Sequence, residues 1–159
     1  MRTRKGDIFM IYHSKTITLK DEQSVIFRNP TPEKEAKILS SVCQSDYDLY
    51  IAAFAENKIV GNCQISFQKR IKTKHRASVS IGILKEYQGL GLGKAMMREM
   101  VSIARKRQIL QLELEYIEGN DRARNLYEKM GFFYTGERPD AIRLKDGTLL
   151  KEISMMKKL

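Results

Sequence analysis

The sequence predicts a mixed α/β fold in which strands outnumber helices. Three observations predict it. The chain has 159 residues, the size of one domain, and contains no internal repeat and no linker rich in Gly, Pro or Ser. Short segments with strand patterns recur along its length, and segments with apolar residues at helical spacing lie between them. We therefore expect a single domain over residues 1–159.

The first part of the chain predicts strands around one short helix. Strand patterns cover residues 8–19 (as a pair), 24–27, 49–55 and 59–68. Thr31 can cap a helix whose first residue is Pro32, and this helix covers about residues 33–42. A tight turn at 56–58 joins the last two strands.

The second part predicts alternating strands and helices. Strand patterns cover residues 77–84, 110–117, 132–137 and 149–156, with a loop expected through Pro139 and Lys145–Gly147. One helix is expected from Arg122 to Met130. An earlier helix, beginning near Leu92, places six apolar residues on one face: Leu92, Ala95, Met96, Met100, Ile103 and Ala104.

Three glycines at alternate positions, Gly89, Gly91 and Gly93, join the strand at 77–84 to this helix. Glycine permits a tight turn with positive φ, and its backbone N–H groups can approach a ligand closely. The helix start adds unpaired N–H groups and the positive end of its dipole. This arrangement predicts an anion site, most often one for phosphate. We expect positive φ at Gly91 and Gly93.

Two familiar phosphate loops are excluded by spacing. A Walker A loop needs a glycine where Gln88 stands and a Ser or Thr where Ala95 stands. A dinucleotide fingerprint needs glycine at position 94 or 96, where Lys94 and Met96 stand. The pattern present is Gln-x-x-Gly-x-Gly, from Gln88 to Gly93, and it resembles the pyrophosphate-binding signature of the GNAT superfamily of acetyl-coenzyme A N-acetyltransferases.

A second segment strengthens this resemblance. Residues 120–132 read Asn-x-x-Ala-x-x-Leu-Tyr-x-x-x-Gly-Phe, the other GNAT hallmark, at the spacing typical of that superfamily. The resemblance covers residues 59–132 and implies a central, mostly antiparallel twisted sheet flanked by helices, with a splayed strand pair at the coenzyme site. The region between Pro32 and Leu49 is shorter than is usual in the superfamily. In the superfamily that region lines the acceptor side of the cleft, so the resemblance does not indicate which amine is the acceptor.

The resemblance implies a coenzyme site around the glycine loop. Its expected members are Ile81, Gly82, Ile83, Gln88, Gly89, Leu90, Gly91, Leu92, Gly93, Lys94 and Asn120. The strand end at 81–83 would pair with pantetheine amides as an added β-strand does. Two alternatives stay open: Gly82 can serve close backbone packing, and Asn120 can be only the cap of the next helix.

The resemblance also implies two catalytic residues. Tyr127 stands where the superfamily's tyrosine protonates the coenzyme thiolate, although its helical position also suits a core residue. Glu115 stands twelve residues earlier, where enzymes similar to the ribosomal-protein alanine acetyltransferases carry their base, acting through water. Glu113 shares its strand face, and we expect this carboxylate to be only solvated.

The composition argues against several other classes of protein. Two cysteines and two histidines form no zinc or disulfide pattern, so we expect reduced thiols, a cytoplasmic location and no metal. No apolar run approaches the ~18 residues of a membrane span. The net charge is +10, but the basic residues are spread along the chain, so nucleic-acid binding is not expected as the main function.

The predicted activity is therefore direct acetyl transfer from acetyl-coenzyme A, as cosubstrate, to a primary amine. The acceptor is expected to be a small molecule such as an amino acid, or a protein N-terminus, and the enzyme a monomer or homodimer. Two alternatives remain: a basic nucleic-acid-binding module, or an acetyl-coenzyme A sensor without turnover on the same fold.

Overall fold

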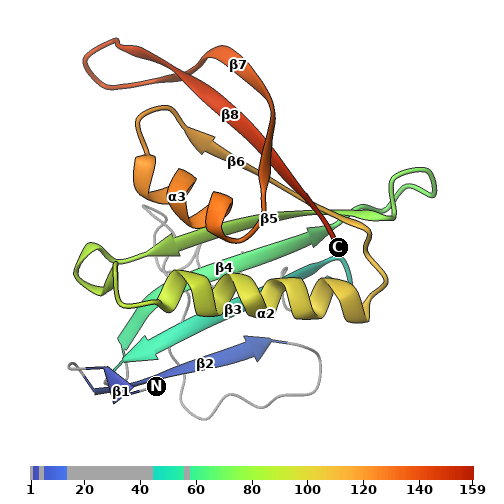
Figure 1. The fold of residues 1–159 in the computed structure, drawn as a ribbon, viewed down its shortest axis with the longest axis vertical. Coiled ribbons are helices and arrows are strands. Elements are labelled where there is room, and N and C mark those ends of the chain that lie inside the picture. Colours follow the sequence, from blue (N-terminus) through green and yellow to red (C-terminus); the bar gives the residue numbers. More distant parts are fainter. Residues whose placement is uncertain (1, 4–5, 14–44, 56–57) are drawn as a thin grey trace. The chain divides into compact units, whose positions relative to one another are not determined.

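A computed structural model describes residues 2–3, 6–13, 45–55 and 58–159 of the chain (Figure 1). The chain forms two compact units, and each is described by itself. Unit 1 contains residues 1–67 and 81–96, and unit 2 contains residues 68–80 and 97–159. One strand and one helix contribute residues to both units.

Unit 1 is built on four antiparallel strands in chain order: β1 (Arg2–Thr3), β2 (Gly6–His13), β3 (Asp48–Ala55) and β4 (Lys58–Phe67). A bulge lies between Ala53 and Phe54 of β3. Alternate residues of β3 and β4 form the core on one face, where Ile51, Ala53, Cys63 and Ile65 are almost completely buried. The unit also contains the end of β5 (Arg76–Ile83), the 3-10 helix η1 (Lys85–Tyr87) and the start of α2 (Leu92–Lys106).

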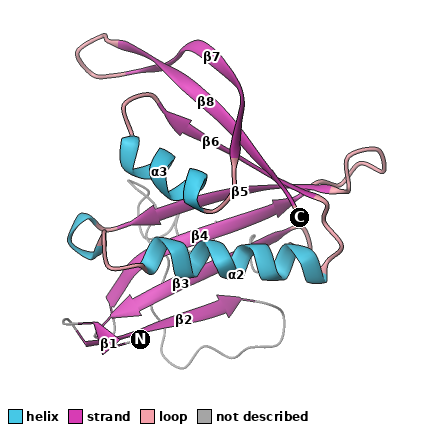
Figure 2. Ribbon diagram, in the orientation of Figure 1, coloured by secondary structure: helices cyan, strands magenta, loops and turns pink. Residues whose placement is uncertain are grey.

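Unit 2 contains the rest of β5 and α2, followed by β6 (Gln111–Ile117), α3 (Asp121–Lys129), β7 (Phe133–Arg143) and β8 (Leu149–Lys158). Its strand order is β5-β6-β8-β7. The β5–β6 pair is parallel, and β6–β8 and β8–β7 are antiparallel. Figure 2 shows β7 and β8 as a long hairpin. The core of the unit is formed by Met97, Met100, Leu112, Leu114, Tyr127, Phe132 and Met155.

The mixed α/β fold and its mostly antiparallel sheet are confirmed. From residue 48 onward, every expected strand and helix is present within a few residues of its predicted limits, apart from the end of β7. The strand expected at 24–27, the helix expected at 33–42 and its cap at Thr31 lie outside the described residues. Of the strand pair expected at 8–19, residues 8–13 belong to β2.

Two predictions are wrong in detail. The buried face of α2 keeps Leu92, Met96, Met100 and Ala104, but Met97 and Val101 complete it in place of Ala95 and Ile103. Periodicity defines this stripe, and its two flanks differ by too little in sequence to indicate which one is buried.

The second error concerns β7, which continues through Pro139 to Arg143 where a loop was expected. Its register with β8 shifts between Arg138 and Ile142, and Asp140 has a φ of 52° there. Because β7 is the last strand in the sheet order, Pro139 can sit in this bulge without removing a needed hydrogen bond.

The parallel ladder between β5 and β6 is short. It pairs Arg76 with Gln111, Ala77 with Leu112 and Ser78 with Glu113, and then ends. Both strands continue beyond it, to Ile83 and Ile117. This short ladder agrees with the splayed strand pair that the sequence predicts.

Candidate active site

The glycine loop lies in unit 1, between β5 and α2. Gly89 and Gly91 have φ values of 77° and 83°, a conformation that favours glycine strongly. Gly93 is the second residue of α2, so the prediction of positive φ is correct for Gly91 and wrong for Gly93. Gly89, for which no such conformation was expected, has it instead.

Gln88 fixes the start of this loop. Its side-chain Nε2 donates a hydrogen bond of 2.9 Å to the carbonyl oxygen of Ile83, the last residue of β5. Its backbone N–H donates to the carbonyl of Lys85, 3.3 Å away, at the end of η1. Gln88 therefore holds the loop against the strand end, which gives the glutamine of the motif a local role in shaping the loop.

The start of α2 directs several backbone N–H groups away from the helix. The first bond into the helix runs from the Ala95 N–H to the Gly91 carbonyl at 3.1 Å. The N–H groups of Leu92, Gly93 and Lys94 precede it and have no partner within the helix. Leu92 is buried and anchors the turn, Leu90 is half-buried, and Lys94 is exposed. The loop thus has the geometry of an anion site, with the positive helix end behind it.

The end of β5 presents the residues expected to pair with pantetheine. Ile81, Gly82 and Ile83 lie beyond the ladder with β6, and the N–H of Leu84 donates to the Val60 carbonyl of β4 at 2.9 Å. A Cβ at Gly82 would lie 3.0 Å from Oδ1 of Asn62. Close packing is therefore one reason for glycine at this position, as the alternative interpretation holds.

Asn120 begins α3 in unit 2. Its Oδ1 accepts a hydrogen bond of 3.1 Å from the Ala123 N–H, so it is the helix cap. The side chain is exposed, and the cap uses only its Oδ1. The capping role is thus established, and a coenzyme contact stays a prediction.

Tyr127 is buried in unit 2, with 6% of its surface exposed. Its ring packs at a tilt against Tyr116 and Phe132, with centroid distances of 6.0 and 6.1 Å. Burial raises the pKa of its hydroxyl above the ordinary tyrosine value, because the phenolate would be poorly solvated. A tyrosine hydroxyl is protonated at neutral pH even at its ordinary pKa, so the raised pKa reflects the burial of the group.

The two carboxylates of β6 differ in their surroundings. Glu115 is exposed, and its Oε1 lies 3.9 Å from a guanidinium nitrogen of Arg138 on β7. Glu113 was expected to be only solvated, and that prediction is wrong. It accepts bonds of 2.5 and 2.7 Å from Arg76 of β5, and the bond from Arg76 is the main cause of its lowered pKa.

Tyr127 and Glu115 lie on opposite faces of β6. Successive side chains of a strand point to opposite faces, and Tyr116, next to Glu115, packs against the Tyr127 ring. The carboxylate and the phenol thus approach β6 from two sides.

Sequence reasoning missed Tyr116, Arg76 and Arg138. Each acts through a partner far away in the sequence, so spacing carried no signal for any of them. Among the described residues, no group of three or more His, Cys, Asp or Glu side chains could hold a metal ion. The described helices include none that is long and apolar enough to cross a membrane.

Comparison with known proteins gives one family. The model of the acetyltransferase (GNAT) family matches residues 16–132. The chain is 26% identical over 133 residues to a 5-NmdU N-acetyltransferase of Pseudomonas phage PaMx11, covering 71% of this chain and 90% of that protein. It is 32% identical over 94 residues to the N-alpha-acetyltransferase RimI of Mycobacterium tuberculosis, covering 59% of this chain and 58% of RimI.

The fold has close counterparts among solved structures. A GNAT-family acetyltransferase from Streptococcus pneumoniae superposes with a TM-score of 0.73 and is 28% identical. The match covers 81% of this chain and 77% of the other. The sequence motifs, the fold and the family model therefore all indicate the same family.

Proposed function

Because the chain belongs to the GNAT family of acetyltransferases, we propose that it moves an acetyl group from acetyl-coenzyme A directly to the nitrogen of a primary amine. The observation that carries this proposal is the glycine turn of left-handed backbone at the start of α2. Its N–H groups suit the pyrophosphate of the coenzyme, because the start of a helix binds phosphate groups.

The coenzyme-binding residues follow from the loop. The N–H groups of Leu92, Gly93 and Lys94 bind the pyrophosphate, while Gln88 keeps the loop in place through Ile83. The backbone of residues 81–83 pairs with the pantetheine amides, since no ladder with β6 uses it.

Tyr127 and Glu115 move the protons. The Glu115 carboxylate, or a water that it holds, accepts a proton from the attacking amine on one side of β6. The carbon–nitrogen bond forms, the carbon–sulfur bond breaks, and the Tyr127 hydroxyl gives its proton to the departing sulfur. A tyrosine hydroxyl is protonated at neutral pH, so the group arrives with the proton that it gives up. Protons then return from solvent to Tyr127 and leave Glu115.

The acceptor is proposed only as a class. One relative is a 5-NmdU N-acetyltransferase and another is the N-alpha-acetyltransferase RimI, so the family relation does not select one acceptor. We propose a small-molecule amine or a protein N-terminus. The net charge of +10 disfavours polyamines and lysine-rich tails, because a cationic surface slows the approach of cations.

A panel of amines tests this function directly. The purified chain is incubated with acetyl-coenzyme A and amino acids, aminated nucleosides, N-terminal peptides or polyamines, and free thiol is measured against time. Acceptor-dependent thiol release is the expected result. A chain that binds acetyl-coenzyme A but releases no thiol with any acceptor is a sensor, and the transferase proposal is then wrong.

A further inference from the structure

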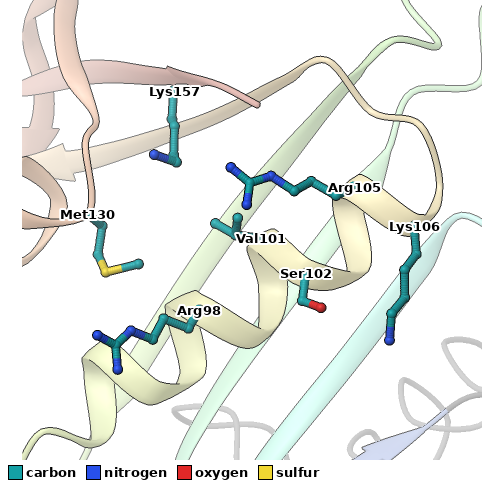
Figure 3. A pocket seen from close by; sticks show the side chains of 7 residues that line it. All are labelled: Arg98, Val101, Ser102, Arg105, Lys106, Met130 and Lys157. Carbon is teal, nitrogen blue, oxygen red and sulfur yellow. The ribbon is translucent and has the colours of Figure 1, made fainter.

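An open hollow in unit 2 is rich in positive charge. It has a volume of about 450 Å³ and lies along the outer part of α2, beside the residue after α3 and the end of β8 (Figure 3). Four cationic side chains line it: Arg98, Arg105, Lys106 and Lys157. The apolar side chains of Val101 and Met130 also line it, and no carboxylate does. We call it the basic hollow.

Three of these cations border one opening. Figure 3 shows the Arg105 guanidinium turned toward Lys157, whose ammonium group points away from it, and Arg98 beside Met130. Lys106 points to the other side of α2. Lys157 Nζ also lies over Gly131, where an added Cβ would be only 2.8 Å from it. The glycine therefore makes room for this ammonium group.

The cations of the basic hollow have no acidic partner in the part of the chain that the structure describes. The ion pairs found there involve Arg76, Arg124, Arg138 and Lys151. Arg105 and Lys106 lie in the last turn of α2, where cations favour the negative helix end. Lys157 Nζ lies close to Gly131, just after the end of α3, where the same effect applies. The effect does not account for Arg98, which lies in the middle of α2. Like charges around one hollow repel one another, and a bound anion would remove the repulsion.

We propose that the basic hollow binds the phosphate backbone of a nucleic-acid strand. Arginine forks match phosphate oxygens, and the net charge of +10 attracts a polyanion. Arg98 and Arg105 are seven residues apart, about 10 Å along α2, which is more than one phosphate spans. Val101 and Met130 provide an apolar surface for a sugar or base. The inference goes beyond acetyl transfer, because it concerns a docking surface.

Binding to labelled oligonucleotides tests this proposal. Fluorescence anisotropy is measured with single-stranded and duplex DNA and RNA, at several salt concentrations and without acetyl-coenzyme A. The variant Arg98→Gln/Arg105→Gln is compared with Lys72→Gln/Lys74→Gln, which removes the same charge from exposed residues before β5. All four side chains are exposed, so both variants are expected to fold.

We expect the wild-type chain to bind, and the hollow variant to bind at least about tenfold more weakly. Its plot of log affinity against log salt should lose a slope of about 1.4 for single strands or 1.8 for duplexes, the value for two phosphate contacts. The control should keep the wild-type slope. Absence of wild-type binding, or an equal loss in both variants, would overturn the proposal.

A second titration separates nucleic acid from the coenzyme's own phosphate. Coenzyme A and dephospho-coenzyme A, which lacks the 3′-phosphate, are titrated into the same two variants. We expect the hollow variant and the control variant to bind coenzyme A with equal affinity, and likewise dephospho-coenzyme A. If the hollow variant loses affinity for coenzyme A alone and keeps its affinity for oligonucleotides, the hollow belongs to the coenzyme and the proposal is wrong. Neither titration depends on turnover, so this result stands apart from the test of the transferase.

Discussion

Tyr127 combines two properties that pull its interpretation in different directions. Its ring packs against Tyr116 and Phe132 like that of a core residue, and it stands at the position where the motif of residues 120–132 implies a proton donor. Sequence reasoning left both roles open for the same reason, since the motif and the helical spacing each explain the tyrosine. Only its hydroxyl distinguishes them.

Tyr127→Phe therefore keeps the ring and removes only the proton. We expect turnover to fall by ~10²–10⁴, the usual range for a lost acid, with little change in melting temperature or coenzyme affinity. The exposed Tyr134→Phe serves as the control and should keep full turnover. Steady-state kinetics and thermal melting measure both variants. Lost stability with an unchanged turnover number would make Tyr127 a core residue only.

Glu115→Gln removes the proposed base and keeps the side-chain shape. The acidic limb of the pH–rate profile should change, because a base must lose its proton before it can act. Glu113→Gln, on the same face of β6, is the control and should keep the wild-type limb. Turnover is measured against pH for the wild-type chain and both variants. An unaltered profile in the Glu115 variant would mean that the amine loses its proton to bulk water.

At the scale of elements, β6 carries both residues that stabilise unit 2 and the proposed base, Glu115. Leu112 and Leu114 face the core, while Glu113 pairs with Arg76 where the ladder to β5 ends. The ion pair thus holds the last paired residues just before the two strands separate. Such a pair contributes about 1 kcal/mol or less once solvent screening is considered, because Arg76 is 37% exposed.

This ion pair predicts a pH dependence of stability. The bond from Arg76 lowers the pKa of Glu113 in the folded chain, so its contribution is present above the unfolded pKa, about 4.3. It is lost as pH falls through the lower, folded pKa. Glu113→Gln should therefore reduce stability near pH 7 and flatten the decline below about pH 5. Denaturant unfolding across that range measures it.

The matched control is Glu128→Gln, which breaks the exposed pair with Arg124 on α3. It should change the free energy of unfolding very little at any pH. If the free energy of unfolding depended on pH in the same way in the Glu113 and Glu128 variants, the pair between Glu113 and Arg76 would not stabilise β6 more than an exposed ion pair does.

At the scale of the whole molecule, the sequence predicted what depends on local pattern. Strand alternation, the glycine turn and the helical stripe of Leu92, Met96 and Met100 each need only neighbouring residues. The path of β7 through Pro139 depends on its place at the edge of the sheet, and the Arg76–Glu113 pair depends on two strands meeting. Neither the path of β7 nor this ion pair can be predicted from the pattern of neighbouring residues. The single domain over residues 1–159 stays a prediction.

The basic hollow illustrates the same limit. The basic residues are spread along the sequence, and only the folding of unit 2 brings Arg98, Arg105 and Lys157 to one opening. The candidate coenzyme loop is the opposite case, because its residues are contiguous. A contiguous motif was found from sequence, and an assembled surface was not.

The central claim is that the glycine loop holds the coenzyme, and calorimetric titration of coenzyme A tests it most directly. Gly91→Val places a branched side chain at a φ of 83°, in the loop, whereas Gly147→Val imposes the same kind of strain at 91° in the open turn before β8. Each substitution should cost ~1–2 kcal/mol of stability. We expect binding of coenzyme A to be at least about tenfold weaker, or ~1.4 kcal/mol, for the Gly91 variant alone. Unchanged affinity in a folded Gly91 variant would contradict it.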